Sequence, residues 1–185
     1  MTPAMLLSVL VLLLCGLLWL AWRAKAIQTE RDKVRWPDRL ARLSPVGRVG
    51  IEEVAAAFLL PSSEQLDSRR IESRLESRDI WNFIAGIEGL KTMQRNANVL
   101  LELACYVQRW NPDASVVAEQ LRLDANQIKT SLAKIHSSER QGTLSTWFPI
   151  YATRATAAYC LMTRRVCALY EVSHEGLLAQ LKAAI

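Results

Sequence analysis

The feature that most constrains this chain is an apolar run near its N-terminus. The run extends from Ala4 to Trp22, carries no charged side chain over nineteen residues, and ends abruptly at Arg23. As an α-helix it would be roughly 28 Å long, which is close to the ~30 Å hydrocarbon core of a bilayer. A helix on the surface of a soluble domain keeps one polar face, which this run lacks. We therefore predict a single transmembrane helix over residues 4–22.

The net positive charge of the chain is confined to the segment that follows the run. Residues 23–48 hold eight basic and three acidic side chains, whereas residues 49–185 hold fifteen of each. Basic flanks stay on the cytoplasmic side of a membrane, and no Lys or Arg precedes the run. We expect the N-terminus outside and the C-terminal domain in the cytoplasm. The predicted membrane-interface residues are Trp19, Trp22, Arg23 and Lys25.

A cleaved signal peptide is the alternative interpretation of the apolar run. Such peptides begin with positive residues and carry small residues in a neutral segment at the cleavage site. No positive residue precedes the run, and the A-x-A match at Ala24-Lys25-Ala26 lies among basic residues. Both features favour an uncleaved anchor.

A basic juxtamembrane segment, residues 23–50, follows the run. Trp36-Pro37 interrupts its helical pattern, because a residue before proline disfavours the helical backbone. The basic side chains here could lie at the phosphate level of anionic headgroups, or they could serve only to orient the anchor. The residues predicted as headgroup contacts are Arg31, Lys33, Arg35, Trp36, Arg39 and Arg42.

The remaining sequence is typical of an all-α protein. Residues 51–78 predict a short helix and a polar linker, and residues 79–185 carry apolar side chains at helical spacing. Short loops between long helices favour an antiparallel bundle. We expect a cytoplasmic domain of three long helices with short flanking helices. The predicted helices are Asp79–Trp110, a second from the cap Asp113 through Ile135, Ser145–Tyr170, and the short His174–Ala184.

Residues Val117–Ile135 resemble a helix-turn-helix of bacterial regulators. The resemblance implies that Lys129 and Lys134 face phosphates or bases of DNA. The matching residues are Ala118 in the first helix, Leu121 and Leu123 beside the turn, and Ile128 and Leu132 at the packing positions of the second helix.

The same stretch also fits one continuous amphipathic helix. Arg122 stands where the regulators favour a glycine, and a side chain there opposes the left-handed backbone that the turn needs. Residues 49–185 have no net charge, whereas DNA binding relies on a basic surface. These two observations favour the continuous helix.

The sequence contains no recognisable catalytic or metal-binding motif. His136 and His174 stand in no zinc or di-iron pattern, and no phosphate-binding or nucleophile motif occurs. Glu88 and Glu102 lie about 21 Å apart along a helix, which is too far for a catalytic carboxylate pair. The four cysteines fit small buried hydrophobic residues. We expect no enzyme activity, cofactor, metal or small-molecule substrate.

These observations favour a membrane-anchored protein that acts by binding. We expect a scaffold role with a protein partner or a second copy of the chain. A seam of leucines in the apolar run, from Leu6 to Leu20, is compatible with self-association. A membrane-tethered DNA-binding regulator that uses residues 117–135 is the alternative function.

Overall fold

The structure is a computed structural model that describes residues 15–16, 19, 35–59, 76–108, 111–173 and 175–185. Every regular element among these residues is a helix, which confirms the predicted all-α class. The chain divides into two compact units, Met1–Asp38 and Arg39–Ile185. The short helix α2 (Trp36–Leu40) includes the boundary between them.

The residues that we predicted to form a transmembrane helix, 4–22, belong to the first unit. Within residues 4–22 only Cys15, Gly16 and Trp19 are described, so that prediction lies almost wholly outside the described part of the chain. The basic segment also lies outside the described part of the chain as far as Val34. Among the helices that are described, none combines the length and the apolar character needed to cross a membrane.

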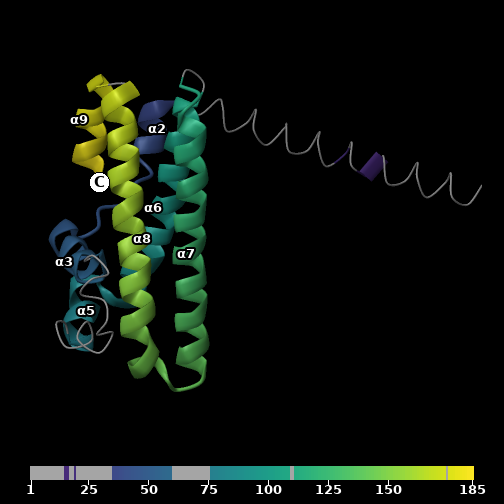
Figure 1. Cartoon of the computed structure of the whole chain (residues 1–185). Helices are drawn as coiled ribbons and strands as arrows, with labels where there is room; N and C mark the ends of the chain where they lie inside the picture. Colours follow the sequence, from purple (N-terminus) through teal and green to yellow (C-terminus); the bar gives the residue numbers. More distant parts are fainter. Residues whose placement is uncertain (1–14, 17–18, 20–34, 60–75, 109–110, 174) are drawn as a thin grey trace, which may run out of the picture. The chain divides into compact units, whose positions relative to one another are not determined.

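The second unit is built around a hairpin of two long helices, α7 (Ala114–Arg140) and α8 (Leu144–Ser173). The turn between them requires Gly142, whose φ of 71° lies in the left-handed region that favours glycine. A third long helix, α6 (Gly86–Val107), packs against both members of the hairpin. Figure 1 shows α7 in green beside α8, with α6 behind them. The predicted helical bundle is therefore confirmed.

The core of this unit lies between α6, α7 and α8. Apolar side chains at helical spacing on each helix point inward, which is the arrangement that the sequence pattern predicts. Burial of each large side chain contributes about 2 kcal/mol to folding. The fully buried members include Leu90, Met93, Leu100, Leu103, Leu121, Ile128, Ile135 and Met162.

The predicted first long helix, Asp79–Trp110, is wrong as a single element. The structure has α5 (Ser77–Phe83) followed by α6, and Ala85 between them has a left-handed backbone with a φ of 57°. The carbonyl of Ile84 then turns toward Gly89, where an added Cβ would lie only 1.6 Å from that oxygen. The glycine thus permits the close approach that ends one helix and begins the next.

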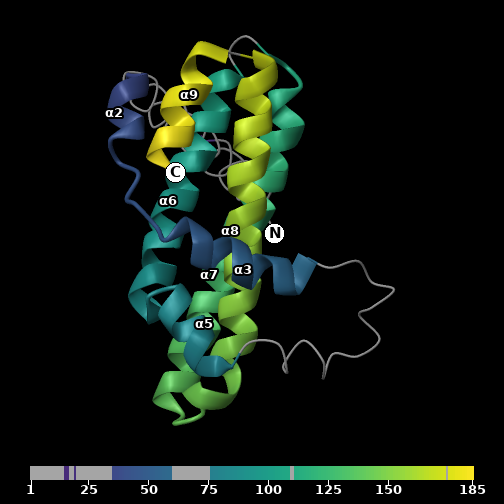
Figure 2. The same ribbon diagram turned by 90° about the vertical axis from the view of Figure 1, so that its left-hand side faces the viewer.

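Two shorter helices complete the second unit. The helices α3 (Arg48–Leu59) and α9 (Glu175–Ala184) both pack against α8. Figure 2 shows α3 lying across α8, with α5 beside it. We expected the bundle domain over residues 79–185, and the compact unit in the structure also includes α3 and the segment that leads to it.

The helix-turn-helix geometry is absent from residues 117–135. Helix α7 continues through Arg122 without a turn, and Arg122 pairs with Glu119 one turn away on the same helix. Leu123 is 66 % exposed, whereas the apolar residues of the inner stripe are buried. The continuous amphipathic helix is therefore the observed structure.

Candidate functional site

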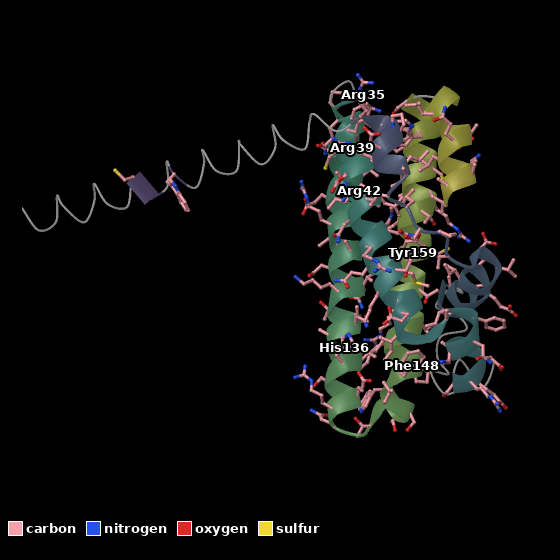
Figure 3. All side chains as sticks on the ribbon, turned by 180° about the vertical axis from the view of Figure 1, so that it is seen from behind. Arg35, Arg39, Arg42, His136, Phe148 and Tyr159 are labelled. Carbon is pink, nitrogen blue, oxygen red and sulfur yellow. The ribbon has the colours of Figure 1, made fainter. Side chains whose placement is uncertain are left out.

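The two ends of the second unit differ in chemistry, and the sequence-predicted residues divide between them. Arg39 and Arg42 lie beside the C-terminal half of α6, where the chain joins this unit. His136 and Phe148 lie near the opposite end (Figure 3). We call the first, together with Asn96 in the middle of α6, the attachment end; its residues are Arg39, Arg42, Asn96 and Glu102. We call the second the aromatic end, defined by Trp81, Phe83, Trp147 and Phe148.

The arginines of the attachment end contact α6. Arg39 is 3 % exposed, donates a hydrogen bond of 3.1 Å to the Glu102 carbonyl, and lies 5.4 Å from the centre of the Tyr106 ring. Arg42 forms an ion pair of 2.7 Å with the Glu102 carboxylate. We expected headgroup contacts for both arginines. In the structure, Arg39 points into the protein, and the partly exposed Arg42 is held by an acidic side chain.

A buried amide holds the next part of the chain in place. The Asn96 amide nitrogen donates to the Ser44 carbonyl (2.8 Å) and to the Tyr159 hydroxyl (3.1 Å). Its carbonyl oxygen accepts from the Ser44 backbone N–H at 3.0 Å. The side chain is 1 % exposed, and such a buried polar group is costly unless it is hydrogen-bonded. Asn96 therefore fixes the segment between α2 and α3 onto the bundle.

Two buried tyrosines line the same half of the unit. Burial raises the pKa of Tyr159, although its hydrogen bond with Asn96 lowers it. Burial also raises the pKa of Tyr170 well above its usual range, and its hydroxyl donates to the Leu103 carbonyl at 2.9 Å. Both phenols stay protonated at neutral pH and serve as hydrogen-bonding groups.

The aromatic end exposes large side chains. Trp81 and Phe83 on α5 are 41 % and 36 % exposed, and Trp147 at the start of α8 is 43 % exposed. The Trp81 ring packs on the buried Phe148 with 4.5 Å between ring centres. Exposed apolar residues are common singly, but Trp81 contacts Phe148 and Trp147 is the chain neighbour of Phe148, so two exposed tryptophans adjoin one buried ring. Such a surface can mark an interaction site.

A groove opens beside Trp147, between the last turns of α7 and the first turns of α8. Its volume is about 270 Å³. The Trp147 and Tyr151 rings form one wall, stacked with 5.9 Å between centres and 22° between planes. Lys134 lies 5.1 Å from the centre of the Tyr151 ring, close enough for a cation–π interaction. We call this the hairpin groove; it is lined by Lys134, Ser137, Ser138, Gln141, Trp147 and Tyr151.

The charges around the hairpin groove are mainly positive. The first eleven residues of α8 contain Arg154 and no acidic residue. The last two turns of α7 carry Lys134 and Arg140, and their acidic residue, Glu139, lies 3.4 Å from His136. The hairpin groove is therefore aromatic on one side and cationic and polar on the other.

A second cleft, of about 250 Å³, lies between α3, α8 and α9. It is lined by Ile51 and Cys160 among other residues, and burial raises the pKa of the Cys160 thiol. Arg164 lowers that pKa and Glu52 raises it, so their effects oppose each other. A protonated thiol is a weak nucleophile and a weak metal ligand. Within the described ranges, no group of His, Cys, Asp and Glu is placed to hold a metal ion.

The other sequence-predicted site residues are distributed as follows. Arg35 and Trp36 belong to the first unit, and Trp19 is exposed there. On α7, Lys129 is exposed outside the hairpin groove, whereas Lys134 lines it. The residues outside the described part of the chain are Trp22, Arg23, Lys25, Arg31 and Lys33.

The aromatic residues of this end are not among the site residues predicted from the sequence. Their signal is the segment from Trp147 to Tyr151, which places three aromatic side chains within five residues at a predicted helix start. The other wall of the hairpin groove comes from α7, which lies beside these aromatic residues only when the hairpin is folded.

The comparisons with known proteins give no relative for this chain. No protein-family model matches it, and neither a curated protein nor a solved structure shows significant similarity.

Proposed function

We propose that the chain is a single-pass membrane-anchored protein whose helical bundle is a non-catalytic interaction module. The anchor is the apolar run 4–22, with the N-terminus outside and the bundle in the cytoplasm. The observation that carries the interaction role is the exposure of two tryptophans, Trp81 and Trp147, that adjoin the buried Phe148. Tryptophan and other large aromatic residues dominate the binding energy of protein interfaces.

The position of the aromatic end supports this role. Tyr151 and Tyr170 lie nineteen residues apart on α8, which corresponds to roughly 28 Å along the helix. Tyr170 bonds to Leu103 near the attachment end, so the exposed aromatic surface is well separated from the place where the chain joins the unit. A partner can occupy the aromatic end without displacing the segment that Asn96 holds.

The charge distribution of the sequence supports the anchor and its orientation. The basic residues of segment 23–48 directly follow the apolar run, which is the arrangement that keeps a flank in the cytoplasm. Resistance of the full chain to extraction by alkaline carbonate tests the anchor. Release into the supernatant, or protection of the bundle from protease in inside-out vesicles, would contradict it.

Site-specific photo-crosslinking in native membranes tests the interaction role. The photoreactive amino acid p-benzoylphenylalanine keeps a large aromatic ring at position 147, so in place of Trp147 it should give a discrete product that it does not give in place of the exposed Lys129. Mass spectrometry then identifies whether the partner is another protein or a second copy of this chain. Equal products from both positions, or none from Trp147, would contradict a specific interaction at the aromatic end.

Glu88 and Glu102, two acidic residues on α6, support a non-catalytic role. Glu88 pairs with Lys91 at 2.6 Å on the exposed face of α6, whereas Glu102 pairs with Arg42 at the attachment end. Neighbouring Lys91 also lowers the pKa of Glu88, which keeps that carboxylate ionised at neutral pH. A general acid needs the opposite shift.

A further inference from the structure

We propose that the hairpin groove binds an extended, acidic peptide segment of the partner. This inference rests on the proposed function and adds the chemistry of what the hairpin groove recognises. It is argued from the two walls of the hairpin groove and from the charges around it.

The aromatic wall fits an extended chain. Trp147 and Tyr151 are one helical turn apart on α8, and their ring centres are 5.9 Å apart. Alternate side chains on one face of an extended peptide are separated by about 6.6 Å. An extended segment that runs along α8 can therefore place two successive side chains of one face against the two rings. Neighbouring side chains on one face of a helix are also about 5–6 Å apart, so the choice of an extended segment rests on the opposite wall of the groove.

The opposite wall supplies polar groups for the backbone of such a segment. Ser137 in the last turn of α7 and Gln141, which directly follows α7, are both exposed and line the groove with Lys134. The hydroxyl and the amide can bond to peptide carbonyl and N–H groups that an extended segment leaves unpaired. Ser138 does not contribute in this way, because its hydroxyl donates to the Ile135 carbonyl at 2.8 Å.

The charges select an acidic segment. The Lys134 ammonium lies over the Tyr151 ring and forms no ion pair with another described residue. Arg140 and Arg154 add positive charge from the two helices, and Glu139 adds one negative charge, 3.4 Å from the His136 ring. A carboxylate placed near Lys134 therefore meets a favourable potential, and a second cation would be repelled.

A nucleic acid could also stack on the aromatic wall, but the charges disfavour it. Binding of single-stranded nucleic acid combines stacked bases with a basic groove that follows several phosphates. Residues 49–185 carry equal numbers of basic and acidic side chains. The hairpin groove itself contributes one cation, Lys134. A short acidic peptide segment therefore matches it better than a phosphate backbone does.

Selection from a random dodecapeptide phage library against the full chain in detergent micelles tests this inference. We expect the selected peptides to be enriched in Asp and Glu. Their affinity should fall at least about tenfold for Lys134→Glu, which places like charges together. Lys129→Glu makes the same charge change on α7 outside the hairpin groove, and it should leave the affinity unchanged. Trp147→Ala should reduce the affinity by a similar factor.

Several results would overturn the inference. One is a set of selected peptides that has no excess of acidic residues. Another is an equal affinity of the peptides for the Lys134→Glu and Lys129→Glu variants. A third is a selection that yields no peptide. Binding of a dodecathymidylate probe that Trp147→Ala abolishes would assign the groove to nucleic acid instead. Thermal unfolding of each variant shows that the loss is not due to misfolding, and Lys134 is exposed enough for its substitution to leave the fold intact.

The outcome is separable from that of the proposed function. A crosslinked partner at Trp147 whose contacting segment is neutral or basic would keep the interaction role and overturn the acidic specificity. Absence of any specific crosslink at Trp147 would instead contradict the interaction role itself.

Discussion

The attachment end and the aromatic end of the second unit use their side chains in opposite ways. At the attachment end, Arg39, Arg42 and Asn96 bond to other parts of the same chain, and two of the three are almost fully buried. At the aromatic end, Trp81 and Trp147 keep about two fifths of their surfaces exposed. One end fixes the chain to itself, and the other leaves surface available to a partner.

This difference implies that stability and binding depend on different residues. Substitutions at the attachment end remove bonds within the fold, so they should lower the free energy of unfolding. Substitutions in the hairpin groove remove contacts with a partner and should change the stability little. Point substitutions can test this separation.

Gly89→Ala, which lies in neither of the two ends, should have the largest effect on stability because it acts on the backbone between α5 and α6. The new Cβ would lie 1.6 Å from the Ile84 carbonyl oxygen, so the backbone must move. We expect a loss of about 3 kcal/mol in the free energy of unfolding, measured by urea denaturation. Gly176→Ala is the matched control, since nothing lies within 4 Å of the added atom. Equal stability of the two variants would contradict the close approach.

Asn96→Ala should destabilise the attachment end. It removes the three hydrogen bonds to Ser44 and Tyr159 and leaves buried polar groups without partners. We expect a loss of about 2–3 kcal/mol, seen as a lower midpoint of thermal unfolding. Asn98→Ala, at an exposed position of the same helix, should cost less than about 0.5 kcal/mol. A similar midpoint for both variants would show that Asn96 does not hold the segment.

Tyr170→Phe should change the stability by about 1 kcal/mol and alter its pH dependence. Burial raises the pKa of Tyr170 above that of the unfolded chain, so the folded protein binds the phenolic proton more tightly. Stability is therefore fully present below the unfolded pKa of about 10 and falls as the pH rises beyond it. Urea unfolding between pH 8 and pH 11 should show a smaller fall for Tyr170→Phe. An unchanged slope would contradict the burial of this phenol.

Arg42→Ala should have the smallest effect on stability. Its ion pair with Glu102 is partly exposed to solvent, with the Arg42 side chain 51 % exposed. Such pairs contribute about 0.5 kcal/mol, and salt weakens them. A loss above 2 kcal/mol, measured by urea denaturation at moderate salt, would show that the ion pair rather than Asn96 dominates the attachment end.

The long helices could be predicted from the sequence because their apolar positions repeat without interruption. The expected Ser145–Tyr170 lies within the observed α8, and the cap expected at Asp113 immediately precedes α7. The break between α5 and α6 could not be placed in this way. It depends on the carbonyl of Ile84 approaching Gly89, which is a contact between backbone atoms that no side-chain pattern records. In the sequence, Gly86 and Gly89 permit a bend in the helix but do not show where the helix breaks.

The candidate sites were harder to predict because their partners are distant in sequence. Arg42 pairs with Glu102, which is sixty residues away in the sequence. The sequence around Arg42 therefore indicates only a basic surface segment. Lys134 is exposed on α7 as the sequence predicts, but the Tyr151 ring beneath it belongs to α8. The turn between the two helices brings them together. Local sequence therefore identifies which residues are polar or aromatic, and the fold determines what they face.

The most direct test of the two-end account is the yield of a crosslink from the hairpin groove in native membranes. A photoreactive amino acid at the exposed Ser137 is combined with Trp147→Ala at the aromatic end or with Arg42→Ala at the attachment end. We predict that Trp147→Ala lowers the yield at least about tenfold, because the loss of an aromatic anchor at an interface commonly costs 2 kcal/mol or more. Arg42→Ala should leave the yield unchanged. Equal yields for the two variants, or a loss only with Arg42→Ala, would contradict the account.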